Sequence, residues 1–291
     1  MTRRPVERAM AQGVLIVASM VVLYPVLWVV NMAFSKSQGF SMTLNLFPED
    51  WTTPSAWPEF LSNRWTLDNF RGLFMEGDGI FFRQMANSLI VAGVTTVVGV
   101  ILSCTAAYAF SRFRFPGRQV GMATFLITQM FPGVVMAIPL YILLDNLRLL
   151  NSLTGLVLVY STTAVPFCVW MLKGYFDTIP RDLEEAAVMD GASQWTIFTR
   201  IVLPLAQPAI VVTALFSFMT AWNEFILAAT FLSDERMYTV PVVLQRFVGD
   251  YNTEWGYFAA GAIIVSIPVM LLFFKLQTYL VGGLTAGAVK G

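Results

Sequence analysis

Six long apolar stretches alternate with polar segments along the chain. They cover approximately residues 11–34, 85–110, 120–144, 153–172, 206–231 and 258–281. Each is long enough to cross the hydrocarbon core of a membrane as a helix, which takes about 17–25 residues. The pattern therefore predicts an all-α membrane protein with six transmembrane helices, and the even number of spans places both ends of the chain on one side.

The first apolar stretch follows a short basic segment, residues 1–10. Signal peptides also begin this way, but their apolar core has only about 7–15 residues and is followed by a small-residue cleavage site. Neither feature fits this sequence. We therefore expect an uncleaved first helix that is preceded by a short cytoplasmic segment, with a transmembrane domain over residues 11–291.

Composition indicates the same class of protein. Hydrophobic residues make up 57% of the 291 residues and charged residues only 12%, whereas a soluble domain carries about 25% charged residues. The net charge of zero gives no reason to propose nucleic acid as a partner. Because the chain has no His, it lacks His-dependent acid–base chemistry and His-ligated metal sites. Cys104 and Cys168 fall inside apolar stretches and are expected to be buried thiols, so we predict no catalytic residue and no metal site.

Basic residues predict the orientation of the chain. They gather before the first span, between spans two and three, around the polar segment 177–205 and at the carboxyl end: Arg3, Arg4, Arg8, Arg112, Arg114, Arg118, Lys173, Arg181, Arg200 and Lys290. Segments rich in Lys and Arg next to spans stay in the cytoplasm. Both termini are therefore predicted to be cytoplasmic, and the loops 35–83 and 233–257 to be extracytoplasmic.

The polar segment 177–205 is predicted to form two short helices. Pro180 suits the first position of the first helix, because its fixed φ fits and its missing N–H has no helical partner there in any case. Gly191 would break this helix, since glycine adopts a positive φ without strain. Ser193 can cap a second helix, which Pro204 would end.

The same segment resembles a known motif. At matching spacing it holds Glu184, Glu185, Ala186, Ala187, Asp190, Gly191, Ile201, Leu203 and Pro204, and it is therefore similar to the EAA loop of the membrane subunits of bacterial ABC importers. The resemblance implies a coupling helix that docks into a groove on a separate ATP-hydrolysing subunit. It also implies that Glu185 pairs with a basic residue of that groove. The alternative is a surface connector that happens to carry Ala and Glu.

Two further segments indicate which kind of ABC importer subunit the chain resembles. Trp222-Asn223-Glu224-Phe225 in span five and the carboxyl end from Gly283 to Gly291 are similar to segments of carbohydrate permeases of the maltose (MalG) type. The implied fold is the MetI-like fold of ABC importer permeases. In that family the carboxyl tail inserts between two ATPase subunits, which implies ATPase contacts for Thr285, Ala286, Gly287 and Lys290.

A few polar residues inside the predicted spans are candidates for a sugar pathway: Gln129, Trp222, Asn223 and Glu224. A carboxylate at membrane depth costs about 2.5–3.5 kcal/mol on insertion scales, so Glu224 is expected to face the interior of the helix bundle. Lining of the pathway and pairing with a neighbouring helix explain this residue equally well.

The loop 233–257 is rich in aromatic and acidic residues, among them Asp250, Tyr251, Asn252, Glu254 and Trp255. Aromatic rings stack well on sugar rings, and the resemblance implies that these residues contact an extracytoplasmic sugar-binding protein. The alternative is a belt of aromatic residues at the membrane interface.

Together these features predict a multi-pass permease subunit of a bacterial inner membrane that forms half of the pathway for maltose, maltodextrin or a similar oligosaccharide. The implied partners are two copies of an ABC ATPase, a second, MalF-like permease subunit, a sugar-binding protein and membrane lipid. The sequence contains no Gly-x-x-x-x-Gly-Lys-Ser/Thr loop, so we expect ATP and Mg²⁺ on the ATPase, with neither enzymatic activity nor a cofactor on this chain. The alternatives are an ABC permease for another solute and an ion-coupled carrier.

Overall fold

The computed structural model describes residues 5–36, 39, 52–55, 57–58, 65–75, 79–249 and 253–288. Most of these residues are helical, and two isolated bridges are the only β-structure in the described part, which confirms the predicted all-α class. The chain forms two compact units. One consists of Met1–Phe82 with Val243–Ile267, and the other of Arg83–Val242 with Pro268–Gly291.

The first unit is organised around α3 (Asp68–Met75), which follows α1 (Pro5–Ala33) in the described chain. The amide of Asn69 donates hydrogen bonds to the carbonyl oxygens of Ala33 (2.9 Å) and Ser35 (2.8 Å), at the end of α1. The ring of Tyr257, near the start of α14 (Trp255–Ala288), lies so close to Gly72 that a Cβ there would be 2.3 Å from it. α3 is thereby fixed to both long helices of this unit.

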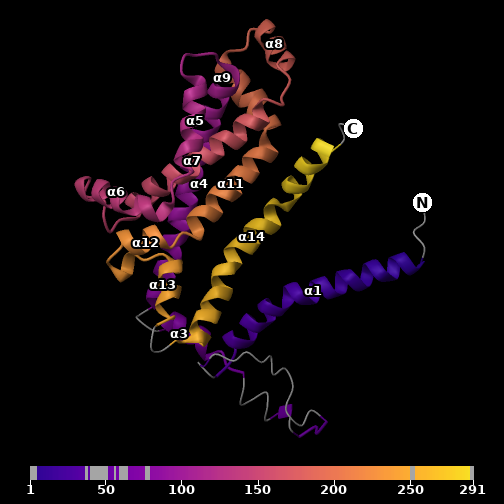
Figure 1. Ribbon diagram of the computed structural model, residues 1–291, viewed down its shortest axis with the longest axis vertical. Helices are drawn as coiled ribbons and strands as arrows, with labels where there is room; N and C mark the ends of the chain where they lie inside the picture. The colour runs from indigo at the N-terminus through magenta and orange to yellow at the C-terminus, as the bar shows by residue number, and fades with distance from the viewer. Residues whose placement is uncertain are drawn as a thin grey trace. The chain divides into compact units, whose positions relative to one another are not determined.

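The second unit contains most of the helices (Figure 1). Its long helices are α4 (Ile80–Arg112), α7 (Leu153–Phe176) and α11 (Gln207–Trp222). The shorter elements are α5 (Arg118–Thr128), α6 (Gly133–Asn146), α8 (Asp182–Met189), α9 (Gln194–Ile197), the π-helix η2 (Phe198–Val202), α10 (Leu203–Leu205), α12 (Ile226–Phe231) and the 3₁₀-helix η3 (Glu235–Met237). α13 (Val240–Arg246) begins in this unit, and from Val243 onward it belongs to the first. α8 lies at one end of this unit, at the top of Figure 1.

Small residues let α4 pack closely against its neighbours. One face of the helix carries them at every fourth position, and all five are buried: Thr95, Gly99, Ser103, Ala107 and Ser111. Small side chains at this spacing allow helices in lipid to approach each other closely. Ser103 Oγ donates to the carbonyl of Val165 in α7 (3.4 Å), and a Cβ at Gly99 would lie 3.3 Å from Ser217 Oγ in α11. One helix face thus packs on two partner helices.

Four of the described helices are long and apolar enough to cross a membrane. They are α1 from Ala9 onward, α4, α7, and α14 as far as Tyr279. Two bent helix pairs raise the number to six if each pair crosses once. The described structure therefore supports four to six spans, and the six predicted spans require that each bent pair counts as one.

The continuous helix predicted over residues 120–144 is broken in the structure. α5 ends at Thr128, α6 begins at Gly133, and the two axes are bent by 103°. Pro132, the N-cap residue of α6, has no N–H with which to continue the hydrogen bonding of α5. An apolar stretch of sufficient length therefore forms two helices with a sharp bend.

The span predicted over residues 206–231 is also interrupted. α11 ends at Trp222, residues 223–225 are not helical, and α12 follows. The Glu224 carboxylate accepts hydrogen bonds from the backbone N–H groups of Leu227 (2.9 Å) and Ala228 (3.1 Å). A side chain that takes these N–H groups competes with the helical ladder and so stabilises the break.

Polar side chains near the start of α4 hold the loop that follows α12. The Asn87 amide donates to the carbonyl oxygens of Arg236 (2.9 Å) and Tyr238 (3.1 Å), and Ser88 Oγ accepts from the N–H of Val240 (2.7 Å). Buried polar groups need hydrogen-bond partners. Here the loop backbone supplies them, which fixes the path of the chain between α12 and α13.

Two glycines of α7 make a matched test of how closely the start of this helix packs against the connection before it. A Cβ at Gly155 would lie 2.3 Å from the carbonyl oxygen of Leu149, whereas a Cβ at Gly174 would meet nothing within 4 Å. We expect Gly155→Ala to lower stability by about 1–3 kcal/mol through overpacking. Gly174→Ala should raise it by up to about 1 kcal/mol, because alanine favours the helix. Thermal unfolding of both purified variants measures the difference, and equal melting temperatures would contradict the packing described.

Candidate functional site

The segment 177–205 forms two short helices, as the sequence predicts. α8 begins at Asp182, two residues after Pro180, with Arg181 at its N-cap. Asp182, Glu184 and Glu185 lie in its first turn, where the positive end of the helix dipole favours carboxylates. The predicted start at Pro180 is therefore two residues early, and the acidic first turn is confirmed.

The turn between the two helices has the predicted chemistry. Gly191 adopts a φ of +80°, and Ser193 Oγ accepts the N–H of Thr196 at 3.2 Å, which caps α9. The N–H groups of Gly191 and Ala192 bond back to the carbonyls of Val188 and Ala187, both at 2.9 Å. Because a left-handed residue is needed for this geometry, glycine suits position 191 better than any other residue.

The prediction that Pro204 ends the second helix is wrong. The helix widens into the π-helix η2, in which the N–H of Leu203 bonds to the carbonyl of Phe198, and it continues through α10 to Leu205. The chain turns at Ala206 instead, where the path bends by 78° into α11. A widened turn before Pro204 accommodates the missing N–H of the proline without ending the helix.

Glu184 points into the protein and pairs with Arg112 at the end of α4. Arg112 Nε lies 2.5 Å from Glu184 Oε1, and the two side chains are only 7% and 12% exposed. Arg112 also donates to the carbonyl of Ile179 at 3.1 Å. Tyr108, one turn earlier in α4, donates its hydroxyl to Glu184 Oε2 or Gln194 Oε1, each at 3.3 Å. The first helix of the segment is thereby attached to α4 by a buried ion pair.

A second set of polar contacts joins the same end of α4 to the end of α7. Ser111 Oγ donates to Asp177 Oδ1 (2.6 Å), and Lys173 Nζ lies 2.5 Å from Asp177 Oδ2. Partial burial alone would raise the pKa of the Asp177 carboxyl. Hydrogen bonds from Lys173 and Ser111 and the nearby charges of Lys173 and Arg118 outweigh burial and hold that pKa below its ordinary value. Asp177 is therefore ionised in the folded chain at neutral pH.

Apolar packing anchors the second helix of the segment. Ile197, Phe198 and Val202 are buried in one cluster with Tyr108 of α4 and Phe176 of α7. The rings of Tyr108 and Phe198 lie 4.8 Å apart. The segment is thus held from within by ionic contacts on its first helix and by apolar contacts on its second.

The outer face of the segment is exposed and partly apolar. Met189 is 87% exposed and Trp195 68% exposed, and Val188 and Glu185 are also exposed. A hollow of about 560 Å³ lies next to this face, lined by Arg112, Phe113, Arg181, Glu184, Glu185, Ala186, Val188, Met189, Gln194 and Ile197. Large apolar side chains that are clustered at a surface and rimmed by charge are typical of a protein interface.

Residues 78–285 match the family described as the inner membrane component of binding-protein-dependent transport systems. The chain belongs to this family. It is a multi-pass membrane permease subunit, which in this family has no enzymatic activity of its own.

Three curated members of the permease family cover between 78% and 100% of the chain. The maltodextrin permease MdxG of Bacillus subtilis is 34% identical over 100% of this chain and 99% of its own length. The maltose/maltodextrin permease MalG of Vibrio vulnificus is 37% identical over 93% of this chain and 91% of its own. The trehalose permease SugB of Mycobacterium tuberculosis is 39% identical over 78% of this chain and 82% of its own.

A solved structure of an alginate ABC importer shares the fold. It aligns with a TM-score of 0.74 at 22% identity, over 96% of this chain and 99% of the other. The fold of the described chain is therefore the MetI-like fold of ABC importer permeases.

The predicted docking residues differ in how exposed they are in the structure. Glu185, Ala186 and Asp190 are exposed, whereas Ala187 and Ile201 are half-buried. Glu184 is also predicted as a docking residue, but it forms an ion pair with Arg112 inside the protein. Leu203 and Pro204 belong to the helix that leads to the bend at Ala206. A role of these residues toward an ATPase stays a prediction.

The pathway candidates gather at two helix breaks. Gln129 lies at the bend between α5 and α6 and donates its amide to the carbonyl of Thr163 in α7 at 3.0 Å. Glu224, besides its backbone contacts, accepts a hydrogen bond of 2.7 Å from the buried Tyr160 hydroxyl of α7. Trp222 is buried and stacks on Phe218, and Asn223 is exposed. The structure thus gives Glu224 a pairing partner, and its role in the pathway stays a prediction.

The remaining candidates lie at the edges of the described chain. Glu254 and Trp255 are described at the start of α14, where the N–H of Glu254 bonds to the carbonyl of Phe247 (2.9 Å). Asp250, Tyr251 and Asn252 lie outside the described residues. Thr285, Ala286 and Gly287 belong to the last turn of α14, and Lys290 lies outside the described residues.

Three residues that hold the site together were not predicted as such. Tyr108 and Tyr160 lie within predicted spans, and Arg112 lies just beyond the end of one, so local patterns give them no special role. The excess of Arg at the end of α4 was attributed to orientation alone. The missing signal is a contact between distant parts of the chain, which only the fold supplies.

The Arg112–Glu184 pair can be tested by neutral substitutions. Arg112→Gln or Glu184→Gln should each lower stability by about 3 kcal/mol, because each leaves one buried charge without its partner. The double variant should lose less than the sum of the two single variants. Thermal unfolding of the four proteins measures this coupling. The pair Arg71–Asp68 is the control, since its side chains are 68% and 74% exposed and 3.9 Å apart.

Arg71→Gln in the control pair should change stability by less than about 1 kcal/mol. If the losses of the two buried single variants simply add in the double variant, the ion pair does not attach α8 to α4.

Removal of one hydroxyl tests the pairing of Glu224. We expect Tyr160→Phe to lower stability by about 1.5–3 kcal/mol, because it deletes a hydrogen bond to a charged group. Tyr141→Phe is the matched control, since the Tyr141 hydroxyl makes no hydrogen bond within the described residues and the residue is exposed. A melting temperature of the Tyr160 variant equal to that of the control would rule out a stabilising contact.

Proposed function

We propose that this chain is the permease subunit of an ATP-driven sugar importer and that the segment 177–205 is its ATPase-docking element. The observation that carries the proposal is the two-sided character of this segment. Its inner side is fixed to α4 and α7 by Glu184, Ile197 and Phe198, whereas its outer side exposes Met189 and Trp195.

Docking would use the outer face. Val188, Met189 and Trp195 offer apolar surface, and the exposed carboxylate of Glu185 offers a partner for a basic residue of the ATPase. Apolar and aromatic anchors surrounded by charge are the common composition of such interfaces. The chain carries no phosphate-binding loop, so ATP and Mg²⁺ would be bound by the ATPase, in two copies.

Movement of the ATPases would reach the spans through two attachments. The Arg112–Glu184 pair would pull on the end of α4, and the apolar cluster around Phe198 would pull on α7. Because packed elements move as rigid bodies, a shift of the segment would tilt both helices together. This coupled tilt would open the pathway to the outside, and ATP hydrolysis would reset it.

The proposed cargo is an oligosaccharide of the maltose or maltodextrin type. Relatives named for maltodextrin, maltose and trehalose transport support a sugar of this size. The break at residues 223–225, with Glu224 held by Tyr160, is the proposed place at which this chain borders the pathway. A second, MalF-like permease subunit would form the other half, and an extracytoplasmic sugar-binding protein would deliver the sugar near Glu254 and Trp255.

The orientation needed for this function is the one that the basic residues predict. The termini and the segment 177–205 would face the cytoplasm, where ATP is found, in the inner membrane of a bacterium. The loop 233–257 would then face the binding protein.

Purification of the tagged chain from its native membrane in mild detergent, followed by mass spectrometry, tests the docking proposal. We expect an ATPase subunit and a second permease subunit to copurify with the wild-type chain. Glu185→Arg should lose the ATPase and keep the second permease, because it places a positive charge opposite a basic groove. Glu7→Arg is the matched control, since Glu7 is also exposed but lies in α1.

Two outcomes would count against the proposal. A wild-type chain that purifies alone and moves solute without ATP would favour an ion-coupled carrier. Copurification of the ATPase, together with a sugar-uptake panel in which no saccharide is taken up, would favour an importer of another solute.

A further inference from the structure

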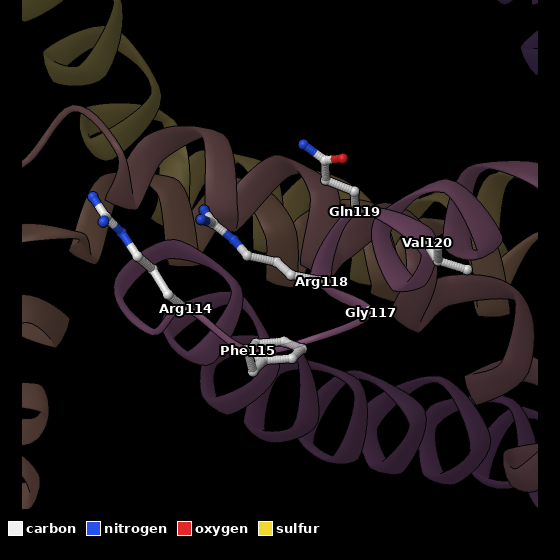
Figure 2. A pocket seen from close by; sticks show the side chains of 6 residues that line it. All are labelled: Arg114, Phe115, Gly117, Arg118, Gln119 and Val120. Atoms are coloured by element: carbon white, nitrogen blue, oxygen red, sulfur yellow. The ribbon is translucent and has the colours of Figure 1, made fainter.

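The turn between α4 and α5 forms a small basic hollow apart from the docking face. The hollow has a volume of about 360 Å³ and is lined by Arg114, Phe115, Gly117, Arg118, Gln119 and Val120. Figure 2 shows the side chains of Arg114 and Arg118 extending from the turn in the same direction. Gly117 makes this arrangement possible, because its φ of +84° reverses the chain between the two arginines.

The positive charge of this hollow is only partly balanced. Arg112 is already paired with Glu184, and Arg118 donates its Nε to the carbonyl of Phe110 at 2.7 Å and lies near Asp177. Arg114 is exposed and makes no hydrogen bond or ion pair within the described residues. The sequence holds no Asp or Glu at all between Asp78 and Asp145. An anion is therefore the ligand that this hollow suits.

Apolar side chains surround the arginines. Phe115 is 41% exposed and Val120 is 70% exposed, and both line the hollow. The centroid of the Phe115 ring lies 5.4 Å from that of the Phe110 ring, and this aromatic contact orients Phe115. No residue of α5 is buried within the described chain. A water-soluble anion would not use these apolar groups, whereas the start of a lipid acyl chain would cover them.

The hollow also lies where one apolar helix ends and the next apolar stretch begins. α4, a candidate span, ends at Arg112, and α5 begins the next apolar stretch at Arg118. The turn between them therefore sits at a membrane boundary. Arginines at such a boundary attract anionic headgroups, and aromatic rings prefer the same interfacial depth.

We infer that Arg114 and Arg118 bind the phosphate of an anionic phospholipid, with Phe115 and Val120 against the upper acyl chains. The orientation of this site, in the leaflet on the ATPase side, rests on the proposed function. Each arginine adds a charge-assisted contact to the phosphate, and Arg guanidinium groups suit phosphate geometry well.

Native mass spectrometry of the purified full-length chain, with any partners that copurify, tests the site. The protein is exchanged into mixtures of phosphatidylglycerol and phosphatidylcholine with identical acyl chains, and the retained lipids are counted. The wild-type chain should retain phosphatidylglycerol preferentially. Arg114→Gln should weaken this preference about fivefold, since a basic residue at an anionic membrane surface contributes about 1 kcal/mol. Arg114→Lys, which keeps the charge, should restore most of the loss.

Arg148→Gln is the matched control, because Arg148 is also exposed but lies in the connection between α6 and α7. An equal loss in Arg148→Gln, or an unchanged preference in Arg114→Gln, would overturn the inference. Displacement of the retained lipid by millimolar inorganic phosphate would point to a site for free phosphate. Loss of a copurifying protein in Arg114→Gln, with lipid retention unchanged, would show a protein interface instead.

Failure of the lipid site and failure of the proposed function are distinguishable. Lipid retention is measured on this chain and does not require an ATPase or a sugar. Copurification of the ATPase and sugar uptake decide the proposed function, and Arg114→Gln should leave copurification intact.

Discussion

The buried ion pair between Arg112 and Glu184 is the contact on which the position of the proposed docking surface depends. α8 has no fully buried apolar side chain, so its position is set by this pair and by the apolar anchors of the helix that follows. A charge removed from water needs its partner, and each member of the pair therefore fixes the place of the other. Two adjacent glutamates consequently differ in environment: Glu184 faces inward and positions the segment, and Glu185 is exposed.

Lipid imposes the second constraint, because it offers no hydrogen-bond partners for exposed backbone groups. The two helix breaks inside the apolar stretches meet this constraint with side chains. Glu224 takes the free N–H groups at the start of α12 and receives the Tyr160 hydroxyl, and Gln129 bonds to the carbonyl of Thr163 beside the bend of α5 and α6. In both places a polar residue that could serve a transport pathway is first needed to satisfy the structure.

Local chemistry was sufficient to predict the helical class, the long apolar helices, the left-handed turn at Gly191 and the cap at Ser193. These features depend on neighbouring residues, which the sequence shows directly. It was not sufficient at Pro132 and Glu224, where hydropathy favours one long helix and backbone hydrogen bonding decides otherwise. At Pro204 the proline predicts the end of a helix, and the helix instead continues to Leu205. The partners of Arg112 and Tyr160 were missed because each contact joins residues more than sixty positions apart.

The row of small residues on α4 has a mechanical consequence. A step of four residues exceeds one helical turn by about 40° and advances about 6 Å along the axis. The row from Thr95 to Ser111 therefore follows a helical path around α4, facing α11 at Gly99 and the end of α7 at Ser111. If α4 moves along its axis by one step of the row, its small side chains face the same neighbours again only if the helix also rotates. Translation without rotation would push larger side chains of α4 into its neighbours, so the row of small residues couples rotation of α4 to its translation.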